Sequence, residues 1–518
     1  MAGSLFTPLK CTLIFGWFLI FLCKAGFSAP AQTIQPRFDE RVELMSVVFY
    51  LAKASEYQNE TIKPYVQSVN DFFHQHKNHD LIDYVAQVRN EYGIAYDAVM
   101  SYALHLKIQD NEVIFNHSLD KNYLDPRWTE DVVDEFLALL NAFYRETNFR
   151  AFFEKNKELY ELASNRFSSK FDEIIDLSWF YEFMGYEMEN KKVLLSFINF
   201  GFYGPSISYE DGTQYAYAIM SCNSSDDEGL PVYTDRAVNI AIHEFLHSYC
   251  NPLADKYYDE MEENARIFFD LNREMLAKQA YGSPETFMRE LLVRACNIMQ
   301  HRNETGDPQS VERLMRKEQL GGFTCMDKIV EALKKYEHNR DKFDDLKQFM
   351  PFIVDVFNSL DPQAHQDEFE KKLEAFGPQV IHSSVEPDQL FVNYNIGRIV
   401  VEFDQPMYEE SNLHETLMLH GGRNTPEIES VYWKSATALV LEVNMRPLTH
   451  YSISFREHLF FSEDNYPLSQ AYILSFITKP HPLIYLVLFI PVVLVIALLN
   501  RKRIRRLISG SARADAAK

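Results

Sequence analysis

The chain has 518 residues, of which 47% are hydrophobic and 24% are charged, and this composition excludes a wholly disordered protein. Only 18 Gly and 21 Pro are present, which excludes collagen-like and low-complexity classes. The net charge of −23 argues against nucleic acid as a partner, because a phosphate backbone would be repelled.

The N-terminus has the features of a secretory signal peptide. Thirteen uncharged and mostly apolar residues lie between Lys10 and Lys24. As a helix they would span about 20 Å, too short for a bilayer core of roughly 30 Å. Ala29 and Ala31 suit a signal-peptidase site, so residues 1–31 are predicted to be removed. The alternative is an uncleaved signal anchor.

Two successive segments are expected to form one peptidase-like domain. Residues 37–190 show helical spacing, most clearly after Thr129, where apolar residues recur every three or four positions. The pattern changes to that of strands between residues 192 and 217, with Asp211-Gly212 as a hairpin signal. A long helix is then predicted from about Thr234 or Asp235, and more helices over 259–358. Residues 191–360 are therefore predicted to be the core of the domain.

The segment 201–209, GFYGPSISY, is a candidate edge strand for binding substrate. Tyr203, Gly204 and Ser206 lie in it, and its Gly and Pro residues allow close approach and restrict pairing. An extended peptide could add to such an edge through backbone hydrogen bonds. The alternative is an ordinary hairpin strand.

Residues 237–249, AVNIAIHEFLHSY, contain the motif HExxH. His243 and His247 are four residues apart, so on a helix both imidazoles face the same side and can bind one zinc ion. Glu244 is displaced by one residue, which places its carboxylate beside a metal-bound water as the general base. The flanking residues are apolar nearly all round the helix, which predicts burial. The alternative is a pair of hydrogen-bonded core histidines.

A third zinc ligand is expected downstream, and Glu290 is the best candidate. Ser283 can cap a helix that begins at Pro284 and carries Glu290 and Arg294 on one polar seam. Arg294 would hold Glu290 in place or bind a developing oxyanion. The alternative is an exposed Glu290–Arg294 pair. The 42 residues between His247 and Glu290 require an inserted helix over 259–280.

Four cysteines remain after the signal peptide: Cys222, Cys250, Cys296 and Cys325. They allow two disulfides in three arrangements, or buried free thiols. Cys250 follows His247 by three residues and could supply a fourth ligand, as could Cys296.

The C-terminal part is predicted to be a β domain followed by a membrane anchor. Short strands recur over 377–478, which favours an immunoglobulin-like sandwich. Residues 480–500 are uncharged and would span about 31 Å as a helix, which predicts a single membrane span. The tail 501–518 holds seven basic residues and one acidic residue, so it is expected on the cytoplasmic side, with the body outside the cytoplasm.

Two parts of the chain resemble known families. HEFLHSYCNPLADKYY and MRELLVRAC, with YGIAYDAVMSYALHL upstream, are similar to the bacterial family called domain of unknown function 4932, over roughly 37–360. That resemblance implies zinc binding by His243, His247 and Glu290, with Glu244 as base. Asn251 and Asp255 also match, and Asp255 is expected to accept a hydrogen bond from a ligand histidine. IVVEFDQPMYEES resembles the signature of bacterial Ig-like modules.

These observations predict an α+β protein with a helical N-terminal region, a zincin-like core, an all-β Ig-like sandwich and one transmembrane helix. The predicted function is that of a membrane-anchored zinc metallopeptidase outside the cytoplasm, acting on a peptide or protein substrate. Two alternatives remain. One is an adhesion or binding receptor with a structural or degenerate zinc site. The other is zinc-dependent hydrolysis of a different substrate class.

Overall fold

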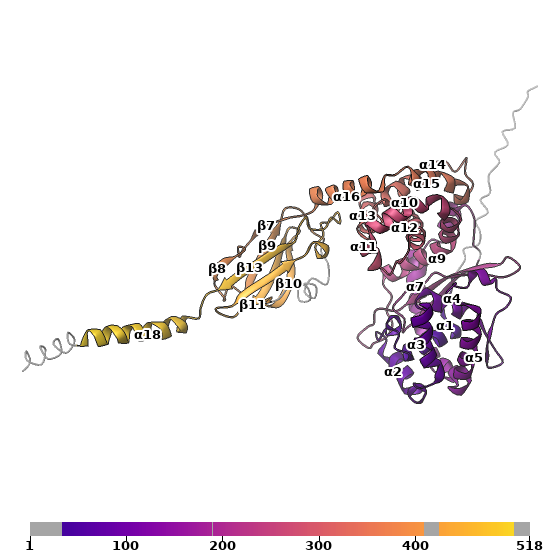
Figure 1. The fold of residues 1–518 in the computed structure, drawn as a ribbon, viewed down its shortest axis with the longest axis horizontal. Helices are drawn as coiled ribbons and strands as arrows, with labels where there is room; N and C mark the ends of the chain where they lie inside the picture. Colours follow the sequence, from indigo (N-terminus) through magenta and orange to yellow (C-terminus); the bar gives the residue numbers. More distant parts are fainter. Residues whose placement is uncertain (1–33, 189, 409–423, 502–518) are drawn as a thin grey trace, which may run out of the picture.

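The structure is a computed structural model that describes residues 34–188, 190–408 and 424–501. A helical body that contains a small sheet is followed by a separate β-sandwich and a last helix (Figure 1). The α+β prediction is therefore confirmed. The predicted signal peptide lies outside the described residues, as does the C-terminal tail after Arg501.

Helices dominate the first part of the chain, as predicted. They are α1 (Glu40–Leu51), α2 (Lys63–Phe72), α3 (Asp80–Tyr92), α4 (Asp97–Leu104), α5 (Glu130–Glu146), α6 (Phe149–Lys155), α7 (Lys157–Ile174) and α8 (Ser178–Met184), with short 3₁₀ turns at Ser55–Tyr57, His74–His76 and Lys121–Tyr123. The sequence predicts that Thr129 caps the helix that follows it, and Thr129 does precede α5, but its side chain makes no capping hydrogen bond, so that part of the prediction is wrong. The hairpin of β2 (Leu106–Gln109) and β3 (Glu112–Phe115) was not predicted, because its strands are only four residues long.

A four-stranded sheet lies inside the helical body, in the order β1-β4-β6-β5. Its strands are β1 (Arg37–Phe38), β4 (Asn190–Ser196), β5 (Ser206–Ser208) and β6 (Gln214–Ser221). β4 runs parallel to both β1 and β6, whereas β5 and β6 form the predicted antiparallel hairpin with Gly212 in its turn at φ +87°. β5 is therefore an edge strand.

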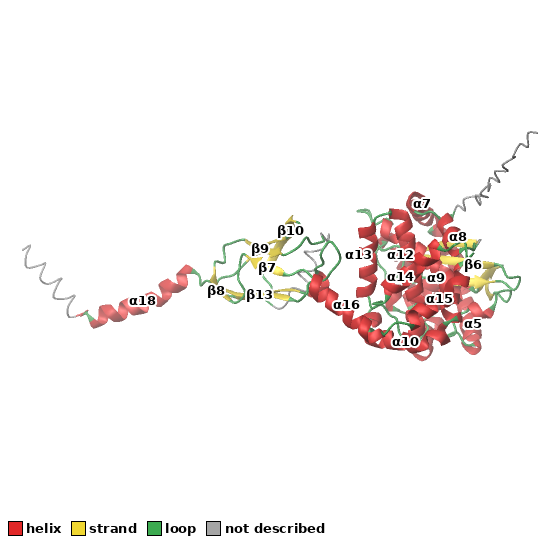
Figure 2. Ribbon diagram, turned by 90° about the horizontal axis from the view of Figure 1, so that it is seen from above, coloured by secondary structure: helices red, strands yellow, loops and turns green. Residues whose placement is uncertain are grey.

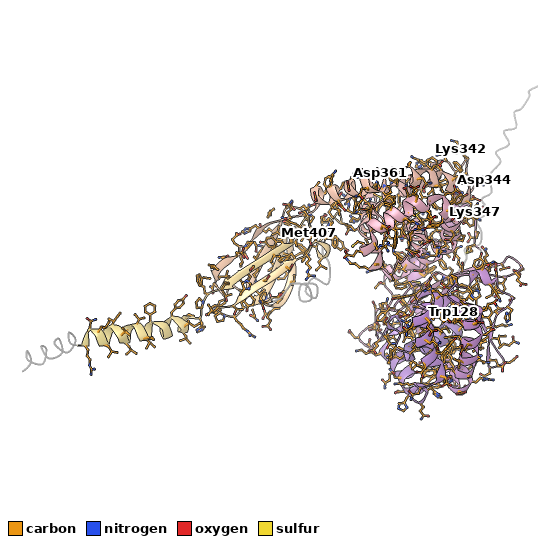
Figure 3. The ribbon with its side chains drawn as sticks, in the orientation of Figure 1. Trp128, Lys342, Asp344, Lys347, Asp361 and Met407 are labelled. Carbon is orange, nitrogen blue, oxygen red and sulfur yellow. The ribbon has the colours of Figure 1, made fainter. Side chains whose placement is uncertain are left out.

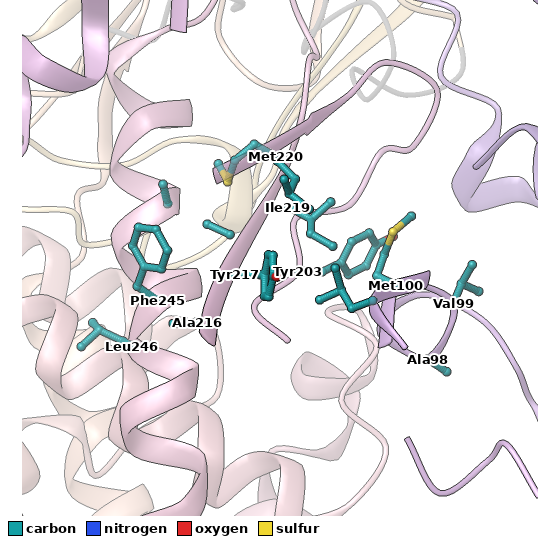
Figure 4. Close-up of a cluster of buried hydrophobic side chains, with 14 of the residues drawn as sticks. Ala98, Val99, Met100, Tyr203, Ala216, Tyr217, Ile219, Met220, Phe245 and Leu246 are labelled. Carbon is teal, nitrogen blue, oxygen red and sulfur yellow. The ribbon is translucent and has the colours of Figure 1, made fainter. Parts of the chain in front are cut away.

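The remaining helices of the body cover this sheet and one another. They are α9 (Asp235–Lys256), α10 (Tyr258–Leu271), α11 (Arg273–Ala277), α12 (Pro284–Thr305), α13 (Pro308–Leu320), α14 (Met326–His338), α15 (Leu346–Asn358) and α16 (Pro362–Phe376). β6 lies between Phe245 and Leu246 of α9 and Met100 of α4 (Figure 4). One continuous core of buried residues runs from Ile34 to Phe357, so the segments 37–190 and 191–360 fold together.

The β-sandwich has its own core. Its two sheets have the orders β10-β11-β9-β7 and β12-β13-β8. The strands are β7 (Val380–Ser383), β8 (Gln389–Val392), β9 (Arg398–Phe403), β10 (Glu427–Ser435), β11 (Ala438–Asn444), β12 (His450–Phe455) and β13 (Tyr472–Thr478). One of the short strands predicted within 377–478, at residues 416–421, lies outside the described residues. α16, which starts after Asp361, leads from the body to the sandwich that contains Met407 (Figure 3).

The last helix is α18 (Pro482–Leu499), which is shorter than the predicted span of 480–500. His481 caps its first turn and Asn500 follows its last residue, so the helix has 18 residues and reaches about 27 Å. Within the described residues, no helix combines the length and the hydropathy that a membrane crossing requires. The structure therefore does not support the predicted membrane span.

Candidate metal centre

The long helix α9 presents both motif histidines from its middle. Thr234 caps it, and the Thr234 hydroxyl accepts a hydrogen bond from the Ala237 amide at 3.3 Å. The apolar residues inside the motif, Phe245 and Leu246, are fully buried on the side of α9 that packs on β6, which fixes the rotation of the helix. The rings of His243 and His247 then lie on one side, with their centroids 4.9 Å apart.

The helix α12 packs against α9 and carries Glu290. As expected from the sequence, Ser283 caps it and Pro284 is its first residue, with the Ser283 hydroxyl 3.2 Å from the Thr286 amide. Glu290 is buried, at 7% exposed, so it is not an ordinary surface partner of Arg294.

His243, His247 and Glu290 come together with their ligand atoms within 4.8 Å of one another. Nε2 of His243 lies 3.7 Å from one carboxylate oxygen of Glu290, and Nε2 of His247 lies 3.5 Å from the other. Ligand atoms bound at 2.0 to 2.1 Å to a tetrahedral zinc are about 3.3 Å apart. The donor types and their spacing therefore fit a zinc ion.

The charge states also suit a metal. Burial lowers the pKa of His243 to about 3, so the imidazole is neutral, as a metal ligand must be. Burial opposes ionisation of Glu290, but His247, His243 and Arg294 outweigh it and lower the pKa of this carboxyl below its ordinary value. The site thus offers the neutral imidazole of His243 and the carboxylate of Glu290 as ligands.

Glu244 is buried beside this group and is not part of it. Burial, followed by the charge of Glu290, raises the pKa of Glu244 well above its ordinary value. Its backbone touches the edge segment: a Cβ added at Gly204 would lie 2.9 Å from the Glu244 carbonyl carbon and overlap its oxygen. Only glycine permits this approach.

The predicted edge strand lies at that contact. Tyr203 exchanges two backbone hydrogen bonds with Ile219, and Pro205 accepts one from Tyr217. In an antiparallel ladder alternate residues face the partner strand, so the backbones of Gly204 and Ser206 face away from β6. Tyr203 is buried and burial raises the pKa of its hydroxyl, so Tyr203 contributes backbone and packing to this edge.

Asn251, which follows the motif, contacts the proposed ligand His247, whereas Asp255 contacts neither histidine. Oδ1 of Asn251 is 3.2 Å from Nδ1 of His247. This contact keeps the imidazole proton on Nδ1 and leaves Nε2 free for a metal. Asp255 does not contact a histidine, contrary to expectation, because it lies about 12 Å along α9 from His247. It pairs instead with Arg289 of α12, at 2.6 and 3.0 Å.

Arg294 holds Glu290 and is itself held. Its Nε donates to Glu290 at 3.1 Å, one terminal nitrogen donates to Tyr281 at 2.7 Å and the other donates to Glu318. The guanidinium also lies 4.8 Å from the centre of the Phe323 ring. These contacts favour the positioning role over the oxyanion role. Tyr281 and Glu318 were missed, because only the fold brings their separate segments to Arg294.

The four cysteines are free buried thiols. Cys250 on α9 interacts with Cys296 on α12, and burial raises the pKa of the Cys250 thiol. Neither belongs to the histidine and glutamate group, which is the metal-compatible cluster of the described residues. Cysteine therefore does not close the site with a fourth ligand.

Known structures resemble this chain only weakly. The N-terminal part of the bacterial S-layer protein SbsC is 9% identical, with 47% of this chain and 58% of that one covered and a TM-score of 0.15. A longer SbsC structure, rSbsC(31-844), is 12% identical, with 78% and 46% covered and the same TM-score. The chain thus spans less than two thirds of either structure, and no argument rests on a TM-score this low. No curated protein matches the chain.

One protein family matches well over half of the chain. The sequence model of the family described as "Domain of unknown function (DUF4932)" matches residues 34–356. This range coincides with the single helical core that runs from Ile34 to Phe357 and holds the candidate metal centre. The chain therefore belongs to the DUF4932 family.

Proposed function

We propose that this protein is a zinc metallopeptidase of zincin-like type that acts outside the cytoplasm. The observation that carries the proposal is the group of the half-buried His243 and His247 with the buried Glu290, whose donor atoms have the spacing of ligands of a tetrahedral metal, with Glu244 beside them. His243, His247 and Glu290 would hold the zinc. When bound, zinc polarises a water and lowers its pKa towards roughly 7.

Glu244 is the proposed general base. It follows His243 directly on α9, and the charge of Glu290 acts on its carboxyl, so it is close to the proposed ligands without being one of them. Beside the positive charge of a bound zinc ion the raised pKa of Glu244 would fall, so that its carboxylate would take the proton from the attacking water and deliver it to the leaving amine. Asn251 keeps the tautomer of His247 that leaves Nε2 available.

The edge segment from Tyr203 to Ser206 is the proposed place for the peptide backbone. The backbones of Gly204 and Ser206 face away from β6, and Gly204 touches Glu244. An extended peptide added there would lie beside the proposed base, with its side chains alternating between two directions. This arrangement favours a peptide over a compact small molecule.

The regions outside the site are proposed to serve this activity. The β-sandwich, which resembles bacterial Ig-like modules in its sequence, would be an accessory domain. The signal-like N-terminal segment supports secretion out of the cytoplasm.

The test is Glu244→Gln in the full chain, assayed on a pool of fluorogenic peptides with mixed central residues. We expect one zinc per chain in both proteins and a loss of hydrolysis of about 10²- to 10⁴-fold in the variant. Glu274→Gln is the matched control, because Glu274 is exposed on α11 and pairs with Lys278. Equal hydrolysis by Glu244→Gln and wild type would show that the proposed mechanism is wrong.

A further inference from the structure

The helix α13 connects the candidate metal centre to the β-sandwich. Val311 and Glu318 are seven residues apart, so they share one face, and both are buried. Arg313 and Arg316 are three residues apart and share another face. α13 stands on the side of the helical body that faces the sandwich (Figure 2). One face of α13 thus looks into the body and the other towards the sandwich.

On the inner face, Glu318 is an anchor of Arg294. The Arg294 guanidinium donates to Glu290, Tyr281 and Glu318 through three different nitrogens, so its position is set by all three partners. Glu318 is the partner contributed by α13, and it is 8% exposed. A buried charged pair is sensitive to the placement of both members. A shift of α13 would therefore move Arg294 and the carboxylate of Glu290.

On the outer face, α13 binds a sandwich loop, residues 462–467, which we call the docking loop. The guanidinium of Arg316 lies 3.5 Å from the centre of the Tyr466 ring, and it donates to the carbonyl of Asp464. The side chain of Asn465 donates to the carbonyl of Arg313 at 3.4 Å. The Tyr466 ring also packs on the ring of Phe376, the last residue of α16, with 5.4 Å between the ring centroids. The docking loop is thus held between α13 and α16.

We propose that the β-sandwich is a supporting part of the metal centre. The docking loop fixes α13 through Arg316, and α13 places Glu318, which in turn positions Arg294 and the ligand Glu290. Arg316 and Glu318 are positioning residues in this scheme, since neither belongs to the metal group. The inference rests on the proposed zinc site and extends it to a domain that the HExxH motif does not include.

The test is the zinc affinity of the full chain, measured by competition with a chromophoric chelator. We expect Glu318→Gln to weaken zinc binding by about ten- to a hundredfold, as loss of a residue behind a metal ligand does. Tyr466→Ala, which removes the ring under Arg316, should weaken zinc binding about fivefold, at the lower end of couplings between distant sites.

Two control variants separate this coupling from general damage. Lys317→Gln changes an exposed residue of α13 that lies between Arg316 and Glu318. Arg398→Gln removes the ion pair between Arg398 and Glu442 at the start of β9. This end of β9 lies away from α16, because Phe403 at the other end pairs with Val380, which closely follows α16. Both should bind zinc as the wild type does.

A second measurement uses the wild type alone, since Glu318→Gln could also disturb folding. Coupling between two sites is reciprocal, so added zinc should slow hydrogen exchange at the amides of Asn465 and Tyr466. Unchanged zinc affinity in Tyr466→Ala, or unchanged exchange in the docking loop, overturns the inference and leaves the zinc site intact. A wild type that binds no zinc overturns the proposed function and this inference together.

Discussion

Glu43 is a carboxyl in the interior of the helical body, far from any bulk water. It lies on α1, is completely buried, and accepts a hydrogen bond from the Tyr65 hydroxyl, which in turn accepts one from Tyr160 at 3.1 Å. Burial raises the pKa of Glu43 to about 7, and the hydrogen bond from Tyr65 offsets only part of that effect. Below pH 7 this residue therefore keeps a proton that the unfolded chain loses above about pH 4.5.

The pH dependence of stability follows from this shift. Between pH 4.5 and 7 unfolding releases the Glu43 proton, so the free energy of unfolding falls as pH rises. Above pH 7 the decrease in the free energy of unfolding caused by Glu43 reaches its full size, roughly 3 kcal/mol. Glu43→Gln should therefore stabilise the protein at pH 8 and have little effect at pH 4.5, as measured by calorimetry.

Glu60→Gln is the matched control, because Glu60 is exposed. The same stability difference between wild type and Glu43→Gln at both pH values would rule out a buried, protonated Glu43.

The residues of the candidate site were easier to predict the closer they lie in sequence to the HExxH motif. His243, Glu244 and His247 follow from a five-residue motif, because helical geometry alone places them. Asn251 lies one turn beyond His247 and contacts it, whereas Asp255 lies two turns beyond and cannot. Glu290 required a second helix, and the Ser283 cap made that helix predictable.

At the scale of elements, local signals predicted the long helices and failed for short pieces. Apolar residues located α9 and the Ser283 cap located α12, because a helix satisfies its own backbone hydrogen bonds. β1 has two residues and becomes a strand only by pairing with Leu194 and Leu195, far along the chain. The edge position of β5 likewise depends on the order of the whole sheet.

The contact between Gly204, which precedes β5, and Glu244 of α9 gives a prediction for Gly204→Ala. The added Cβ would overlap the Glu244 carbonyl, so the edge segment and α9 must separate. Such overpacking costs about 1 to 3 kcal/mol in stability. We expect peptide hydrolysis to fall by about tenfold or more, since a small displacement of positioning groups is costly. Enzyme assays and thermal unfolding measure both effects.

Gly282→Ala is the control for this variant. A Cβ at Gly282 meets no atom within 4 Å, so activity and stability should be unchanged. Wild-type hydrolysis by Gly204→Ala would mean that the edge segment is not part of the site.

The described residues form two separate cores, which predicts two unfolding events. Metal removal acts on the body that holds the site, because a ligand stabilises only the state that binds it. A chelator should lower the melting temperature of the helical body by roughly 5 °C or more, and shift that of the β-sandwich much less. Calorimetry with and without chelator measures this difference.

Glu290→Gln should lose this response to the chelator. Equal shifts in both transitions, or a response that Glu290→Gln retains, would contradict a zinc site built on this carboxylate.

The sequence by itself determined the α+β class, the Ser283 cap, the hairpin at Gly212 and the histidine pair, since each depends on residues within about one or two turns of one another. The tertiary structure alone decided that Glu290 reaches the histidines and that Asp255 does not. It also decided that the cysteines stand apart from the metal group and that α13 joins Arg294 to the docking loop. These contacts depend on how helices that are far apart in the sequence pack together. Many packing arrangements satisfy the same local sequence pattern, and only the close packing of one shared core selects among them.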